Sequence, residues 1–425
     1  MTTTSRREFL KSGAAIAGAA LTLSEVPLVH AGGDDLLRVG LIGCGGRGSG
    51  AAIQALRADK NVKLVAMADA FADKIESSLE SIAKEKDIAE TVDVPESRRF
   101  AGFDAYEKVI AQSDVVLLAT PPHFRPIHLK AAVDAGKHVF AEKPVAVDAP
   151  GVRSVLASCA AAAKKNLSVV SGLCLRYSSN FREMMDRLHD GAIGDIVSLQ
   201  ANDLRGPIRV TKREKDWTDM QYQMRNWYYF TWLCGDFNVE QHVHFLDVCA
   251  WALKNEYPVR VVGTGGRQVR TGEEYGHIYD HFAVVYEYQN GVRLYSQCRQ
   301  QEGCEKDMSA YAAGTKGRAV ISEDRMKITG SSEWEKDGKE DNKFYQEEHN
   351  QLFASIRNSK PINNGDYMAR STLMAIMARM AAYTGKAITW EAALKSSEDL
   401  SPPRYDWDVV LPAPKVAMPG VTEFK

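Results

Sequence analysis

A short strand followed by a glycine-rich turn and a helix limits the fold of this chain more than any other feature. The apolar run Leu37–Ile42 suits a strand that is buried on both faces. The sequence GCGGRG, residues 43–48, follows it directly and opens a helical pattern that continues to about residue 56. Asp69 ends the next apolar run, 21 positions after Gly48. This order predicts a parallel sheet whose first turn binds a ligand.

Apolar runs and helical patterns continue to alternate as far as residue 171. Further runs lie at residues 62–68, 115–119, 138–141 and 167–171, and the clearest helical patterns lie at residues 126–135 and 152–165. Alternation of this kind predicts parallel strands joined by helices that cover both faces of the sheet. We therefore expect an α/β fold in which residues 36–171 form a Rossmann dinucleotide-binding domain.

The turn fits the pattern G-x-G-x-x-G, and each glycine in it has a mechanical reason. Gly43 permits the tight turn, Gly45 lets a pyrophosphate approach the amides of the helix N-terminus, and Gly48 lets helix and strand pack closely. Asp69 would accept hydrogen bonds from the adenosine ribose hydroxyls and repel a 2′-phosphate, which favours NAD over NADP. A glycine-rich loop without a ligand is the alternative, and the strand, helix and acid around the turn argue against it.

A second group of candidates follows the later strands at the same edge of the sheet. Lys143 belongs to the turn Glu142-Lys143-Pro144, which closes the run at 138–141. It would therefore lie beside a bound cofactor, where its ammonium can hydrogen-bond a substrate hydroxyl. A solvated surface lysine is the alternative, which the position after a buried strand disfavours. The expected cofactor contacts are Gly43, Gly45, Gly46, Arg47, Gly48, Asp69, Thr120, Pro121, His123, Glu142 and Lys143.

The sequence pattern changes near residue 172. Strands that alternate apolar and polar residues are expected at 196–202, 259–265, 281–288, 292–299, 309–313, 318–322 and 326–329. Asn290-Gly291 predicts a hairpin turn between two of them. A long helix is expected at 368–383, and the charged stretch 331–342 is expected to be an exposed loop. Residues 172–390 are thus predicted to form an α+β domain with an open, largely antiparallel sheet, followed by a C-terminal extension, 391–425.

Residues 1–31 look like a twin-arginine export signal. Arg6 and Arg7 precede a small apolar segment, residues 14–23, that is too short for a stable membrane anchor. Val29-His30-Ala31 then offers small residues at the two positions that signal peptidase reads. A disordered basic tail is the alternative. The signal predicts an exported, periplasmic protein with no transmembrane anchor after cleavage.

The bulk composition excludes some classes of protein. The 425 residues are 45% apolar and 25% charged, which is typical of a soluble two-domain chain. The net charge is −2 with no long basic run beyond the signal, so nucleic acid is not an expected partner. The seven cysteines include no Cys-x-x-Cys spacing, and we expect free, mostly buried thiols, although Cys298 and Cys304 could pair.

The residues that carry a family resemblance are AGKHVFAEKP at 135–144, GLIGCGGRG at the first turn, and the strand-ending Asp69. Through them the chain resembles the Gfo/Idh/MocA family (glucose–fructose oxidoreductase, inositol dehydrogenase, rhizopine catabolism). The resemblance covers nearly all of residues 36–390. It implies a Rossmann domain, a second domain with an open mixed sheet, and NAD(P) chemistry on sugars, polyols or their derivatives. It also implies a homodimer or homotetramer formed through that sheet.

The family carries an Asp-x-x-x-His pair in its second domain, and the matching residues here are Glu240 and His244. The glutamate departs from the family's aspartate, and His242 stands where the family usually has glycine. On a helix running to residue 253, Glu240 and His244 would share a face, with His244 a candidate general acid or base. A metal site that includes His242 is one alternative, but helical residues two apart point to different sides. Packing roles for both histidines are another.

Arginines and aromatic residues near these segments are weaker candidates for substrate contact. Arg176 and Tyr177 follow the last expected Rossmann strand, and Arg225 and Trp227 precede the acid–histidine segment. Aromatic faces can stack on sugar C–H groups, although core packing is the alternative; Asn180 is a comparable candidate. The expected catalytic residues are Lys143, His244 and Glu240, and the expected substrate contacts are these three with Arg176, Tyr177, Arg225 and Trp227; no metal is expected.

Together these features predict an NAD(P)-dependent oxidoreductase that acts on a sugar, polyol or glycoside. An exported NAD enzyme must load its cofactor before export and keep it, and the twin-arginine route is known for exporting folded proteins. A retained cofactor must return to its starting oxidation state in each catalytic cycle. Either the oxidation of one sugar is coupled to the reduction of a second, or the enzyme catalyses a redox-neutral glycoside hydrolysis. Release of a ketosugar, with reoxidation of the cofactor by a partner, is a third possibility. A non-catalytic sugar-binding protein is less favoured, because Lys143, Glu240 and His244 are all present.

Overall fold

The structure is a computed structural model that describes residues 35–337 and 343–425. The predicted export signal, residues 1–31, lies outside the described residues. Within the described ranges, no helix combines the length and the apolar character needed to cross a membrane. All seven cysteines are free, six of them buried and Cys304 exposed, which confirms that prediction.

A parallel sheet of six strands forms the N-terminal domain. Its order is β3 (Arg99–Ala101), β2 (Val62–Asp69), β1 (Leu37–Ile42), β4 (Val115–Leu118), β5 (His138–Ala141) and β6 (Val169–Ser171). The helices that accompany it are α2 (Gly46–Ala58), α3 (Ala72–Ala83), α4 (Ala105–Gln112), α5 (Arg125–Asp134) and α6 (Ala149–Lys164). Strands β4 and β5 are buried throughout. The strand order reverses between β1 and β4, which is where such a sheet opens a crevice for a ligand. The predicted Rossmann fold is confirmed.

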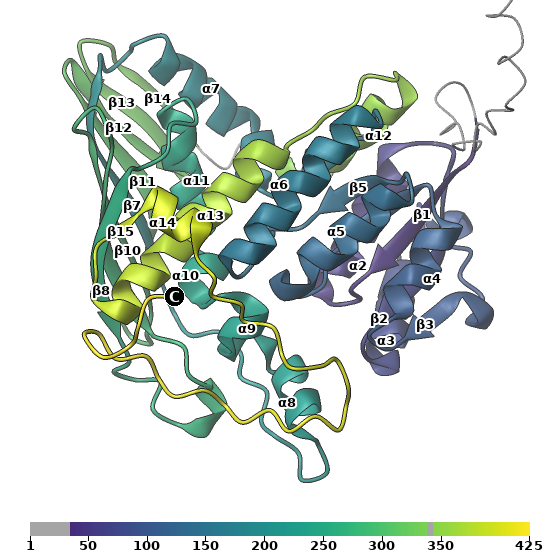
Figure 1. Cartoon of the computed structure of the whole chain (residues 1–425). Coiled ribbons are helices and arrows are strands. Elements are labelled where there is room, and N and C mark those ends of the chain that lie inside the picture. Colours follow the sequence, from purple (N-terminus) through teal and green to yellow (C-terminus); the bar gives the residue numbers. More distant parts are fainter. Residues whose placement is uncertain (1–34, 338–342) are drawn as a thin grey trace, which may run out of the picture.

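In the described part of the second domain, nine strands form a mixed sheet. Its order is β14 (Trp334–Asp337), β13 (Arg325–Gly330), β12 (Gly317–Ser322), β11 (Asp307–Gly314), β7 (Ile196–Arg205), β10 (Arg293–Gln300), β9 (His281–Glu287), β8 (Arg260–Gly266) and β15 (Ile388–Thr389). Among these described strands, only the neighbours β7 and β10 run parallel, and the other neighbours are antiparallel. The expected Asn-Gly hairpin joins β9 to β10. Helices α11 (Val243–Ala252) and α13 (Gly365–Thr384) lie against one face, so the open sheet is confirmed (Figure 1).

Two expectations for this half of the chain are wrong. The charged stretch 331–342 contains a strand, β14, which pairs with β13; cross-strand ion pairs from Arg325 and Lys327 to Glu335 stabilise this edge. The single helix expected to carry Glu240 and His244 up to residue 253 is two helices, α10 (Phe237–Glu240) and α11, and a further short helix, α9 (Thr231–Cys234), precedes them. The positive φ angles of Gly235 and Asp236 end α9, and the helix is interrupted again at Gln241 and His242, before α11.

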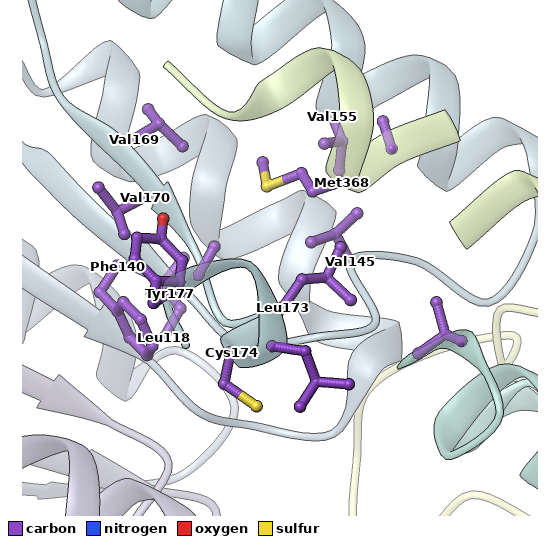
Figure 2. Close-up of a cluster of buried hydrophobic side chains, with 14 of the residues drawn as sticks. Leu118, Phe140, Val145, Val155, Val169, Val170, Leu173, Cys174, Tyr177 and Met368 are labelled. Carbon is purple, nitrogen blue, oxygen red and sulfur yellow. The ribbon is translucent and has the colours of Figure 1, made fainter. Parts of the chain in front are cut away.

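The segment after β14 returns to the N-terminal domain. Helix α12 (Phe344–Arg357) packs on α2, and α13 packs on α6 between the two sheets (Figure 1). Figure 2 shows Met368 of α13 in one apolar cluster with Leu118 and Phe140 of the Rossmann strands. The two domains therefore share a continuous core. The remaining helices are α7 (Ser179–His189), α8 (Asp219–Arg225) and α14 (Trp390–Lys395).

Candidate active site

A cavity of about 460 Å³ lies at the carboxyl ends of the parallel strands, between the two domains. Its walls come from the first turn, the ends of β2, β4 and β5, helix α8 and the segment from α10 to α11. The predicted residues that line it are Gly43, Gly45, Gly46, Arg47, Asp69, Thr120, Pro121, Glu142, Lys143, Arg225, Trp227, Glu240 and His244. The tertiary structure thus brings most of the predicted site together.

The glycine turn has the shape that a pyrophosphate requires. Gly43 has a φ of +100°, and a Cβ there would lie 2.4 Å from the backbone nitrogen of Thr120. A Cβ on Gly48 would lie 1.9 Å from the carbonyl oxygen of Gly43, so this glycine allows α2 to pack on the turn. Positions 45 and 46 face open space, because a Cβ on either would meet no atom within 4 Å. The N-terminal amides of α2 are therefore accessible to an anion.

Asp69 connects the turn to the end of β2. Its carboxylate accepts hydrogen bonds from the backbone amides of Cys44 (2.7 Å) and Phe71 (3.1 Å). Burial raises the pKa of this carboxyl group, and the two amides partly offset that effect. A carboxylate has about four acceptor positions, so Asp69, which lines the cavity, can still accept hydrogen bonds from ribose hydroxyls.

Arg47 is held by two buried carboxylates. Its guanidinium donates to Glu142 at the end of β5 and to Glu348 of α12 (2.9 Å), and it stacks on the Tyr345 ring 4.4 Å away. Burial and the neighbouring Glu142 raise the pKa of Glu348 well above its usual range. Because Arg47 and Tyr345 both line the cavity, α12 helps to position this part of its wall.

Lys143 and Glu240 form the centre of the predicted catalytic group. The Lys143 ammonium donates to the Glu240 backbone oxygen (2.6 Å) and to Glu240 Oε1 (3.1 Å). Burial raises the pKa of Glu240, and the charge of Lys143 opposes that shift. The second carboxylate oxygen, Oε2, has no hydrogen-bond partner within the described chain. Glu240 thus fixes the ammonium and keeps one oxygen for a ligand.

His244 lines the same cavity from the first turn of α11. Burial lowers its pKa well below the usual value, and the positive charges of Lys143 and Arg205 lower it further. The imidazole is therefore neutral, and a neutral imidazole can accept a proton. Glu240 and His244 reach the cavity together although they belong to two separate helices, α10 and α11.

His242 points elsewhere. It is fully buried, its Nε2 lies 2.7 Å from the hydroxyl of Ser296 on β10, and it does not line the cavity. The two histidine side chains therefore do not converge. In the described part of the chain, no group of three His, Cys, Asp or Glu side chains is arranged to hold a metal ion.

The structure places Arg176 and Tyr177 outside the cavity. Arg176 forms a buried two-point ion pair with Asp247 (2.7 and 2.8 Å) and stacks on Tyr367. Tyr177 belongs to the apolar cluster of Figure 2, and its hydroxyl donates to Asn364 (2.7 Å). The expectation that Arg176 and Tyr177 contact the substrate is therefore corrected, because the turn that follows β6 directs both side chains into the core.

Two predicted cofactor contacts also lie outside the cavity. Gly48 is buried under the turn, where it packs as its predicted role requires, and it does not line the cavity. His123 faces the C-terminal extension, and its Nε2 lies 2.8 Å from the hydroxyl of Tyr405. Burial lowers the pKa of His123 to about 4. The expectation that His123 contacts the cofactor is therefore corrected as well.

Other cavity residues were not predicted from the sequence. Arg125 is fully buried, and its guanidinium donates to the backbone oxygens of Glu142 (2.8 Å) and Thr120 (2.6 Å), which fixes the two strand ends together. An arginine at the first position of α5, shortly after the end of β4, was the available signal. Tyr345, Gln241 and Met224 also line the cavity, but no local pattern marks them.

Comparison with known proteins agrees with this architecture. Residues 37–171 match the oxidoreductase family with an NAD-binding Rossmann fold, and residues 181–320 match the GFO/IDH/MocA C-terminal domain. A levoglucosan dehydrogenase in complex with NADH and levoglucosan has the same fold, with a TM-score of 0.65 and 16% identity over 84% of this chain and 99% of that one.

Three curated relatives show how far the sequence similarity extends. An uncharacterised oxidoreductase of Streptococcus pneumoniae is 25% identical over 42% of this chain and 44% of its own length. Inositol 2-dehydrogenase of Rhizobium meliloti is 24% identical over 69% of this chain and 77% of its own length. A glycosyl hydrolase family 109 protein of Streptomyces coelicolor is 28% identical over 38% of this chain and 33% of its own length. The two matched domains, in the order and fold that the structure has, show that this chain belongs to the GFO/IDH/MocA family of NAD-binding oxidoreductases.

Proposed function

We propose that this protein oxidises a CH–OH group of a sugar, polyol or glycoside and holds its NAD tightly. The observation that carries the proposal is the position of Lys143, Glu240 and His244 in one cavity with the glycine turn. The proposed nucleotide contacts are Gly43, Gly45, Gly46, Arg47, Asp69, Thr120, Pro121, Glu142 and Lys143. When bound, NAD takes up the hydride that leaves the substrate carbon and can return it.

The side chains supply the proton chemistry of this oxidation. The Lys143 ammonium can donate a hydrogen bond to the substrate hydroxyl oxygen, while Glu240 holds Lys143 in place. Neutral His244 accepts the hydroxyl proton as the C–O bond becomes a carbonyl, and its protonated form returns the proton in the reverse direction. Trp227 and the polar side chains of the wall suit a ligand with both C–H faces and hydroxyl groups.

A redox-neutral glycoside hydrolysis is the second candidate. After oxidation, the new ketone acidifies the neighbouring carbon; the glycosidic bond is eliminated, water adds, and the hydride returns. This sequence needs proton transfers at two substrate positions, and Glu240, with its raised pKa and its unpartnered oxygen, could serve beside His244. The similarity to a glycosyl hydrolase family 109 protein supports this candidate, although over only 38% of this chain.

The first experiment measures cofactor content. The chain from residue 32 is purified without added cofactor and denatured, and the supernatant is assayed for NAD and NADH. Near-stoichiometric release supports retention; an empty protein with weak NAD affinity would contradict it. The purified protein is then incubated with inositols, aldoses and nitrophenyl glycosides. NADH formation or exchange between two sugars supports oxidation, and nitrophenol release without added NAD supports the hydrolytic candidate.

We also propose export by the twin-arginine route and assembly into a homodimer or homotetramer. Arg6→Lys with Arg7→Lys should leave the protein in the cytoplasmic fraction of a bacterial host, whereas unchanged export would exclude the signal. The open face of the large sheet carries Tyr295, which is 47% exposed, and supports the assembly proposal. Light scattering on the purified protein measures the oligomeric state, and a monomer would exclude it.

A further inference from the structure

The C-terminal strap, which we define as residues 396–425, runs across both domains. Near its start, the Leu400 amide donates to Asp148 at the N-terminus of α6 (3.0 Å). Near its end, the Gly420 amide donates to the carbonyl oxygen of Thr384 at the end of α13 (2.9 Å). In Figure 1 the strap, drawn in yellow, leaves α14, passes α9 and α8, and returns toward the large sheet. Both ends are therefore anchored, and the middle crosses the side of the molecule that carries α8.

The middle of the strap packs on aromatic residues of the Rossmann domain. Trp407 lies against Phe71 and Phe103, with ring centroids 5.1 and 4.5 Å apart. Phe71 follows β2 and lines the main cavity. Phe103 follows β3 and lines a smaller apolar recess of about 50 Å³, which shares Asp69 and Pro121 with the main cavity. Trp407 thus braces two side chains that form walls at this end of the site.

This end is where the adenosine half of a dinucleotide belongs. Asp69 at the end of β2 can accept hydrogen bonds from the ribose, and the recess beside it is apolar, as a purine ring requires. Phe71 is also covered by the Arg225 guanidinium, 4.0 Å from its ring, and Arg225 pairs with Asp73 (2.8 Å). The Phe71 ring, in contact with both Trp407 and Arg225, cannot easily swing aside to let a ligand leave.

Helix α8, which carries Arg225, is itself tied to the strap. The Leu411 amide donates to Asp219 in the first turn of α8 (3.1 Å), and the Gln223 side chain donates to the Leu411 carbonyl oxygen. The strap therefore contacts both walls of the adenosine end, one through Trp407 and one through Leu411. The sequence gives no local sign of these contacts.

We propose that Trp407 is a positioning residue that holds Phe71 and Phe103 against the adenosine half of NAD, so that the C-terminal strap slows release of the cofactor. The inference rests on the proposed function, in which NAD stays bound through the catalytic cycle. A merely structural Trp407 would contribute to folding stability but would leave the rate of cofactor dissociation unchanged once the protein is folded.

The test measures NADH dissociation by stopped-flow fluorescence from the chain beginning at residue 32, with excess NAD as the chase. Trp407→Ala removes two aromatic contacts and should accelerate dissociation about tenfold. Trp407→Phe keeps a ring and should restore a rate within about twofold of the parent. The matched control is Trp390→Ala, because Trp390 is also half-buried and stacks on Tyr257 (5.1 Å), but Tyr257, unlike Phe71 and Phe103, lines neither the cavity nor the recess. Its rate should not change.

Each result decides the inference. An unchanged rate in Trp407→Ala overturns it, as does an equal acceleration in Trp390→Ala, which would indicate a general loosening. If Trp407→Ala does not fold, Trp407→Leu keeps apolar volume without a ring, and its rate decides in the same way. A parent protein that binds no NADH overturns both this inference and the proposed function. A parent that retains NADH with no effect of Trp407 overturns the inference alone.

Discussion

Replacing Lys143 by methionine removes the ammonium and keeps much of the side-chain volume. In the structure, that ammonium makes two contacts with Glu240, at 2.6 Å to the backbone oxygen and 3.1 Å to Oε1. General acid–base groups contribute about 10²–10⁴-fold to a rate, and such a loss corresponds to roughly 3–5 kcal/mol of barrier. We expect kcat/KM of Lys143→Met to fall by that range, while the affinity for NADH falls much less, because Lys143 is one of several expected cofactor contacts.

The same substitution has a smaller, calculable effect on stability. Without Lys143, the buried Glu240 carboxylate loses its cation, and its pKa, already raised by burial, rises further. The group then becomes protonated instead of remaining as an unpaired charge, so the cost is that of an unsatisfied buried polar group, about 1–3 kcal/mol. The double variant Lys143→Met, Glu240→Met should recover part of this stability, because neither position then carries an unsatisfied buried polar side chain, but none of the activity.

The assay compares kcat/KM on the best substrate of the panel, NADH affinity by fluorescence titration, and unfolding in denaturant. Lys130→Met is the matched control, because it removes an ammonium–carboxylate pair with Asp134 from the surface of the same domain. It should change neither rate nor stability by a measurable amount, as expected for an exposed pair. Turnover of Lys143→Met within about threefold of the parent, against the 10²–10⁴-fold expected, would refute the assignment of Lys143.

Three further predictions concern proton transfer, the glycine turn and the core. Burial and nearby positive charge hold the pKa of His244 well below its usual value of 6.5, so its neutral form persists on acidification. The acid limb of the kcat/KM pH profile should therefore lie well below pH 6.5. A limb at or above pH 6.5 would contradict the assignment of neutral His244 as the base. Gly48→Ala places a Cβ 1.9 Å from the carbonyl oxygen of Gly43, so it should cost about 1–3 kcal/mol of folding stability and weaken NADH binding in titrations. Gly206→Ala is the control, because a Cβ there meets no atom within 4 Å, and it should change neither quantity. Arg176→Met leaves the buried Asp247 without its ion-pair partner and should destabilise the fold by about 3–5 kcal/mol, measured by denaturant unfolding. A raised KM with unchanged stability would instead show that Arg176 contacts the substrate.

Much of the Rossmann half could be predicted because its signals are local. The run Leu37–Ile42, the glycine turn and Asp69 lie within one short stretch, and β1, α2 and β2 form where their patterns predict. Lys143 could be placed for the same reason, because parallel strands deliver their carboxyl ends to one edge of the sheet. In the second domain, the Asn-Gly turn predicted the hairpin of β9 and β10 by its backbone geometry alone.

Predictions failed where a side chain's surroundings come from distant segments. Arg176 follows a Rossmann strand and looked suited to a ligand, but Asp247, 71 positions later, pairs with it inside the core. The charged segment around Glu335 looked like a loop, yet an edge strand tolerates charge because one side of it faces solvent. Glu240 and His244 reach one cavity across a helix break that their spacing did not reveal.

The sequence by itself determined the fold class, the nucleotide-binding turn and the identity of the lysine, acid and histidine candidates. The type of each element and the parallel course of the strands follow from patterns of neighbouring residues, so a few dozen residues are enough to predict them. Only the tertiary structure decided which charges pair and which walls close the site. Arg47 meets Glu348 across 301 positions of sequence, and Trp407 meets Phe71 from the far end of the chain. Contacts of this kind depend on how whole elements pack, and packing leaves no mark in the local sequence.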